Sequence, residues 1–309
     1  MSVLPPSNTP PAATSAAVPT PRIWSAVDAA DLTPFALWIL TILLAALGYG
    51  TTLQDTVINV LLLAGLIAIG IPHGAVDHLL DSGMWNSRRT PLFILKYLVK
   101  AALMVGVWMV VPQAALVFFL LYSAVHFGEA DGKQWGFTMA ESVLWGCSVM
   151  AFILGTHSTE TTAIIRTMGT QSAFPALPFY ALLPWLGWAV VRRSTTLAIT
   201  VMWLSAATML PLLAVFGMYF IGQHSFTSWI HICRRLERSQ FTVWMHALPF
   251  NAGAWLLLGV FFWLWPHSML DTHTTYGAFF IFVGCLSFPH VIEMHWMYRT
   301  FRRGGAIEV

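Results

Sequence analysis

Four histidines lie inside long apolar segments, where a polar side chain is costly and usually functional. They occur in GIPHGAVDH, YSAVHFGEADG, YFIGQHS and LSFPHVIEMH, as His73, His126, His224 and His290. Imidazole binds iron, zinc, copper and nickel. No cysteine accompanies these histidines. An all-histidine, oxygen-reactive iron site is therefore the sharper hypothesis, and a redox-inactive zinc site is the alternative.

Two carboxylates lie close in sequence to these histidines. Asp77 follows His73 by four residues, and Glu129 follows His126 by three, so each shares a helix face with its histidine. A carboxylate in such a place can accept the second N–H of a metal-bound imidazole and fix its orientation. We therefore expect Asp77 and Glu129 to take part in catalysis in this way, with Asp77 orienting His73.

Four further polar residues are candidates for hydrogen bonds around the ligands, or for replacing a ligand: His78, His231, Glu293 and His295. His78 lies about 140° round the helix from His73, and His231 lies about 10 Å along the axis from His224, so neither is expected to share one metal with that neighbour. Glu293, by contrast, can share a helix face with His290. The other histidines, in or beside expected loops, are interpreted as interfacial polar residues: His157, His246, His267 and His273.

The composition is that of a membrane protein. The chain is 57% hydrophobic and 9% charged, whereas a soluble domain carries about 25% charged residues. The net charge of +2 gives no indication of a nucleic-acid partner. The three cysteines form no zinc pattern and no disulfide framework.

Long apolar runs predict an all-α, polytopic membrane helix bundle. A crossing needs about 20 apolar residues, and candidate runs occur near 34–50, 57–80, 93–111, 113–129, 139–155, 174–191, 249–266 and 275–298. The region 196–232 is longer than one crossing requires, and Pro211 and Gly217 predict a hairpin there. The preferred count is about ten spans, and eight or nine are the alternatives.

Basic residues predict the orientation. Arg192 and Arg193 precede the hairpin, and Arg234 and Arg235 follow it, so both of its ends lie on one side if cytoplasmic loops carry the positive charge. The same rule places both termini in the cytoplasm. We expect a bacterial inner-membrane protein with three parts: a disordered tail over residues 1–30, one transmembrane domain over 31–300, and a short basic tail over 301–309.

The four histidines fall at similar depths in this topology. Each lies roughly 5–10 residues before the cytoplasmic end of its span, or about 8–15 Å deep at 1.5 Å per residue. Four spans therefore deliver imidazoles to one layer of the membrane.

The four motifs resemble those of the Brp/Blh family of membrane β-carotene 15,15′-dioxygenases. The similarity rests on GIPHGAVDH, HFG, YFIGQHS and FPHVI, in the family's order, and spans roughly residues 57–298. It implies a non-haem Fe(II) enzyme that splits β-carotene, or a related carotenoid, with O₂ into two retinals, within the lipid bilayer and in functional linkage with a microbial rhodopsin. Carried over, the iron ligands are His73, His126, His224 and, as the fourth, His290.

One position departs from the family pattern. The family continues the HS motif to a second histidine four residues after the first, and this chain has Ser228 there. Serine is a poor ligand for Fe(II). The departure leaves three hypotheses: His290 completes the site, the iron has an open position, or the activity differs.

Three rival functions are alternatives. A carotenoid-binding subunit without cleavage activity is favoured by Ser228. A membrane hydroxylase or desaturase normally carries HxxxH and HxxHH clusters, which this sequence lacks, although Asp77, Glu129 and Glu293 are candidates to bridge two metals. A transporter would explain the helices broken by Pro and Gly, but the sequence shows no inverted repeat.

Overall fold

The computed structural model describes residues 29–82, 89–264 and 272–303, and within these ranges every regular element is a helix. The expected tails lie largely outside the described residues, although Phe301–Arg303 still belong to the last helix. In chain order the helices are α1 (Ala29–Ala46), α2 (Thr52–Gly65), η1 (Leu66–Gly70), α3 (Pro72–Ala75), α4 (Asp77–Ser82), α5 (Arg89–Val110), α6 (Pro112–Gln134), α7 (Met139–Thr156), α8 (Ser158–Thr167), α9 (Leu183–Val191), α10 (Thr195–Ala207), α11 (Leu212–Gly217), η2 (Met218–Ser225), α12 (Phe226–Arg235), α13 (Gln240–Leu264) and α14 (Thr272–Arg303).

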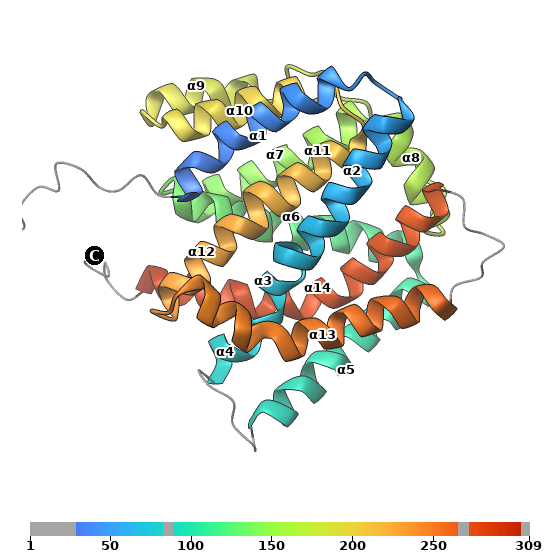
Figure 1. The fold of residues 1–309 in the computed structure, drawn as a ribbon, viewed down its shortest axis with the longest axis vertical. Helices are drawn as coiled ribbons and strands as arrows, with labels where there is room; N and C mark the ends of the chain where they lie inside the picture. The colour runs from blue at the N-terminus through green and yellow to red at the C-terminus, as the bar shows by residue number, and fades with distance from the viewer. Residues whose placement is uncertain (1–28, 83–88, 265–271, 304–309) are drawn as a thin grey trace, which may run out of the picture.

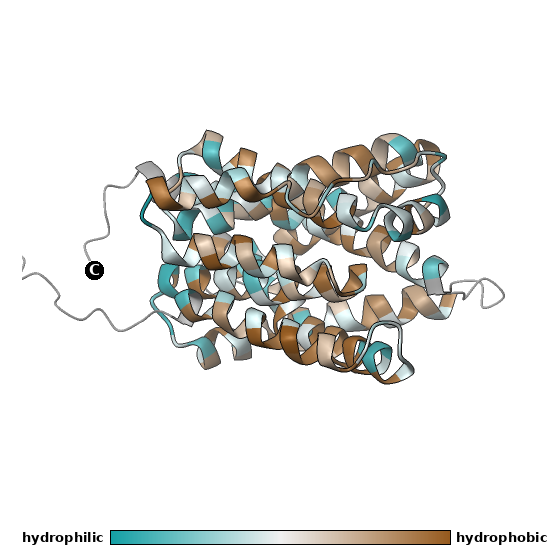
Figure 2. Cartoon of the chain, turned by 90° about the horizontal axis from the view of Figure 1, so that it is seen from above, coloured by the Kyte–Doolittle hydropathy of each residue, from teal (hydrophilic) through white to brown (hydrophobic). Residues whose placement is uncertain are grey.

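The chain is a polytopic membrane helix bundle. Six of the described helices are long and apolar enough to cross a bilayer, and two shorter apolar helices, Asp31–Ala46 and Thr195–Ala207, accompany them. Helix α1 begins and α14 ends at the same end of the bundle, where α12 also joins α13 (Figure 1). Apolar residues are frequent along the helices between the two ends (Figure 2), and many large apolar side chains of the described residues are exposed. The predicted all-α membrane helix bundle is confirmed, with six membrane-length helices in the described residues where about ten spans were expected.

The apolar run 174–191 is not a membrane-length helix. Within 174–191 only α9, Leu183–Val191, is helical, and its nine residues extend about 14 Å, half of the roughly 30 Å hydrocarbon core. Pro175 and Pro178 precede α9 in a segment without helix. Proline lacks the N–H that a helix interior needs, so apolar composition alone overestimated this helix.

The break predicted between 196 and 232 occurs at Pro211, which caps the N-terminus of α11. Gly217, in contrast, lies inside an uninterrupted helical run from α11 through η2 to α12. Helix α13 begins at Gln240, so His246 lies in a helix and not in the loop where it was expected.

Two glycines bring α6 and α7 into close contact. A Cβ on Gly128 would lie 1.8 Å from the Ser142 carbonyl oxygen, and a Cβ on Gly146 would lie 1.8 Å from that of Ala124. Any larger residue at either position therefore collides with backbone. The glycine of HFG thus has a packing role beside its neighbour His126.

Candidate metal centre

The four candidate histidines come from four separate helical segments. His73 lies in α3, His126 in α6, His224 in η2 and His290 in α14. Their side chains are almost completely buried, with 0–4% of each residue exposed. Buried imidazoles without a function would be costly at this depth.

Local irregularity accompanies three of the four histidines. His73 follows the π-helical turn η1, and His224 lies within the longer π-helix η2. Pro289 lies inside α14 immediately before His290. Insertions of π-helix are frequent at functional sites because they redirect side chains. The Pro and Gly residues of the motifs therefore mark places where the backbone leaves regular α-helix.

The ring nitrogens converge on one point. Ligand nitrogens of His73, His126 and His290 lie within 4.8 Å of one another, and His224 Nε2 lies 3.1 Å from His126 Nε2. Two nitrogens bound in cis to one metal at about 2.1 Å each would be separated by about 3 Å. The group of His73, His126 and His290 can therefore hold a metal ion. His224 lies beside this group through its contact with His126, and its role as a fourth ligand stays a prediction.

The second nitrogens of two rings are held by hydrogen bonds. His73 Nδ1 donates to the carbonyl of Gly70 at 2.6 Å, and His290 Nδ1 donates to both carboxylate oxygens of Asp77 at 2.9 and 3.0 Å. Both rings therefore keep Nε2 for a ligand. The Nε2 of His290 has no hydrogen-bond partner among the described residues.

The expected pairing of Asp77 with His73 is thus corrected. The Gly70 carbonyl is available to His73 because the Gly74 N–H bonds to Ile71 instead, where the π-helical turn meets α3. Asp77 is left to reach across to α14. Proximity within one helix predicted the role of the carboxylate but not its partner.

Glu129 also has another partner than its sequence neighbour. It accepts from Nδ1 of His295 at 2.9 and 3.0 Å, whereas Nδ1 of His126 has no hydrogen-bond partner among the described residues. Glu293 pairs with Lys100 at 3.1 Å. Among the described residues, the group that could hold a metal consists of histidines alone. This weakens the two-metal alternative, which needs carboxylates as bridging ligands.

The remaining polar candidates surround the centre without joining it. His78 stacks on Phe250 at 3.8 Å between ring centroids, and its Nδ1 donates to the Ala75 carbonyl. His231 lies 3.4 Å from the Tyr298 hydroxyl. Ser228 is fully buried in α12, one turn beyond His224. The four histidines therefore come together without a contribution from the serine position.

His157 is not an exposed interfacial residue. It is 8% exposed, and its ring, at the junction of α7 and α8, donates to the Leu210 carbonyl 2.8 Å away. Its place beside a loop was predicted, but its burial was not, because α11 and the turn before it pack against this end of α7. His246 and His273 are exposed as expected, and His267 lies outside the described residues.

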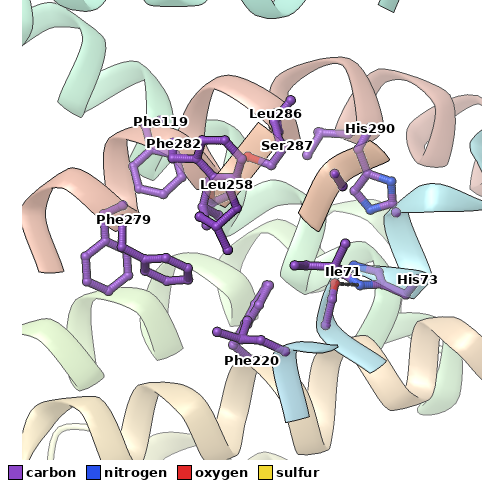
Figure 3. A pocket seen from close by; sticks show the side chains of 18 of the residues that line it. Ile71, His73, Phe119, Phe220, Leu258, Phe279, Phe282, Leu286, Ser287 and His290 are labelled. Carbon is purple, nitrogen blue, oxygen red and sulfur yellow. Dashed lines mark hydrogen bonds between the residues drawn. The ribbon is translucent and has the colours of Figure 1, made fainter. Parts of the chain in front are cut away.

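An apolar cavity of about 620 Å³ adjoins the histidines. His73 and His290 point into one part of it, and Phe119, Phe279 and Phe282 gather at the opposite part (Figure 3). Binding sites for small apolar ligands are typically lined in this way, with few polar groups. Phenylalanines from three helices contribute to the lining: Phe119 from α6, Phe216 from α11 and Phe279 from α14.

Sequence reasoning missed two polar supports. The buried Asp131 accepts from Trp145 Nε1 at 2.8 Å and from the Tyr219 hydroxyl at 2.7 Å, which ties α6 to α7 and to η2. The hydroxyls of Tyr97 and Tyr122 donate to the carbonyls of Leu286 and Gly284 in α14. The sequence did indicate the contacts of Tyr97 and Tyr122 with α14. Pro289 lies inside that helix, and a proline there disturbs the hydrogen bonding of the preceding turn.

Known proteins resemble this chain over most of its length. Residues 64–298 match the family model described as beta-carotene 15,15′-dioxygenase. A curated protein of that name from an uncultured marine bacterium, 66A03, is 25% identical over 260 residues, which cover 77% of this chain and 93% of the relative. No solved structure matches the chain.

Proposed function

Because the chain belongs to the beta-carotene 15,15′-dioxygenase family, we propose that it is a membrane dioxygenase that cleaves the central double bond of β-carotene. One O₂ is consumed for each β-carotene, the C=C bond is replaced by two C=O bonds, and two retinals form. All four electrons needed to reduce O₂ come from the cleaved bond, so no other reductant is required. The observation that carries the proposal is the convergence of four buried imidazoles beside an apolar cavity.

The proposed cofactor is one Fe²⁺ held by His73, His126, His224 and His290. Imidazole donors suit this ion, and the family resemblance favours iron over zinc. When bound, the iron would supply activation of O₂. The unpaired Nε2 of His290 and the short separation between His126 and His224 support this donor set.

The protein's own residues would prepare the centre. Asp77 would hold the ring of His290, and the Gly70 carbonyl would hold that of His73, so that both present Nε2. Such supports typically change metal affinity by about 10–100-fold. Glu129, which binds His295, would position α14 against α6 and would not touch substrate. The apolar lining would exclude water from the reacting bond.

The substrate would enter from the bilayer. The cavity is lined by Leu98 on α5 and Leu256 on α13, which are 46% and 68% exposed. An apolar carotenoid dissolved in lipid could pass between these helices without crossing water. We further propose that the protein resides in a bacterial inner membrane with both termini in the cytoplasm, and that its retinal serves a microbial rhodopsin.

Conversion by the purified protein tests the proposal. Incubation with β-carotene under air is expected to give two retinals for each β-carotene consumed, with one O₂ taken up. The control is the same mixture under argon, which is expected to give none. β-Carotene that is bound but unchanged under air would favour a carotenoid-binding subunit instead, the function that Ser228 raises as the second candidate.

A further inference from the structure

The cavity beside the histidines is closed at one end. Met168, which follows α8, and Leu212 on α11 line it and are 4% and 2% exposed. The backbone N–H of Leu212 donates to the Glu160 carboxylate on α8 at 2.9 Å, so α8 and α11 close this end together. The side near α5 and α13 is the open side of the cavity, because Leu98 and Leu256 line the cavity there and are exposed.

The distance from the histidines to the closed end follows from helix geometry. Along α14 the lining runs from His290 to Phe279, and along α6 it runs from His126 to Leu116. At 1.5 Å per residue these segments are about 15–17 Å long. Met168 lies close to Gly277, just beyond Phe279 on α14.

This distance corresponds to one half of β-carotene. Nine bonds separate the central double bond from the ring, and at about 1.2 Å per bond, the rise of an extended chain, they span about 11 Å. The ring adds a few ångströms more. When one ring reaches the closed end, the central double bond therefore lies at the histidines.

We propose that the closed end, formed by Met168 and Leu212, is the binding site for one ring of the carotenoid and selects which double bond is cleaved. This inference rests on the proposed function. The site takes an apolar cyclic end group, and the other half of the substrate extends toward the open side. Neighbouring double bonds are about 2.5 Å apart along the chain, so a small change in depth brings a different bond to the histidines.

Binding of half of the substrate tests the site without catalysis. All-trans-retinol, titrated into the purified full-length protein under argon, is expected to quench tryptophan fluorescence with saturation. Leu212→Trp, which fills the closed end, should weaken binding about tenfold or more, or 1.4 kcal/mol. Leu103→Trp is the matched control, because Leu103 is 65% exposed on α5 and lies outside the cavity lining. Equal retinol affinity in Leu212→Trp and the wild type would overturn the proposal.

Cleavage products provide the second test, which also serves if Leu212→Trp does not accumulate. Met168→Ala lengthens the closed end and is expected to yield aldehydes of unequal length from β-carotene beside retinal. Retinal alone at the wild-type rate would overturn the role of this end in selecting the bond. A wild type that binds retinol as expected but makes no retinal would instead contradict the proposed function and leave the ring site standing.

Discussion

The hydrogen-bond partner of each imidazole decides which of its nitrogens faces the centre. Gly70 and Asp77 occupy Nδ1 of His73 and His290, and this leaves Nε2 of each ring for a metal. The sequence predicted the four histidines from residue type, depth and motif. It did not predict the partner of Asp77, because that partner depends on how α14 packs against α3 and α4.

Asp77→Asn is predicted to weaken metal binding by about 10–100-fold and leave the protein inserted in the membrane. The amide keeps the shape of the carboxylate but loses the charge that stabilises the N–H of His290. Metal affinity, measured by competition with a chelator of known affinity, checks this. Asp55→Asn, on the exposed first turn of α2, is the control. Equal affinity in Asp77→Asn and the wild type would contradict the role of Asp77.

At the scale of elements, close packing of α6 against α7 fixes the position of His126. Gly146→Ala is predicted to destabilise the protein by about 1–3 kcal/mol or more, because its Cβ would collide with the Ala124 backbone. The check is the midpoint of thermal unfolding in detergent. Gly106→Ala on α5 should not lower it, because a Cβ there meets no atom within 4 Å. An unchanged midpoint in Gly146→Ala would show that the helices can separate at no cost.

The buried ring of His157 links α7 to the turn before α11. His157→Ala is predicted to cost about 1–3 kcal/mol, because the Leu210 carbonyl loses its donor. Thermal unfolding reports the loss, and retinal formation at low temperature should stay near that of the wild type. His246→Ala, on an exposed face of α13, should change neither quantity. Loss of metal from His157→Ala would contradict a purely structural role.

Helix existence was largely predictable from apolar runs, whereas several helix lengths were not. The helices α5, α6 and α7 follow their expected runs closely. The run 174–191 failed because Pro175 and Pro178 prevent helix, and α13 begins earlier than its apolar run because polar residues continue the helix toward Gln240. Composition reports hydrophobicity, but local backbone chemistry decides where a helix begins and ends.

For the whole molecule, basic residues gather at the joins of α9 with α10 and of α12 with α13. The positive charge of these joins predicts that they face the cytoplasm. A reporter that is active only in the cytoplasm should therefore be active when it is fused after Val309 or between Arg192 and Arg193. It should be inactive when it is inserted at Gly50, between α1 and α2. Activity at Gly50 and none at the other two sites would reverse the orientation.

The central claim is that four histidines from distant parts of the chain hold one iron ion. The most direct test is elemental analysis of the purified wild type and of four variants: His73→Ala, His126→Ala, His224→Ala and His290→Ala, with Ser228→Ala and His273→Ala as controls. The wild type and both controls are predicted to carry about one iron per chain, and each of the four variants is predicted to lose it. Iron retained in His290→Ala, or lost in Ser228→Ala to the extent seen in His224→Ala, would contradict the account.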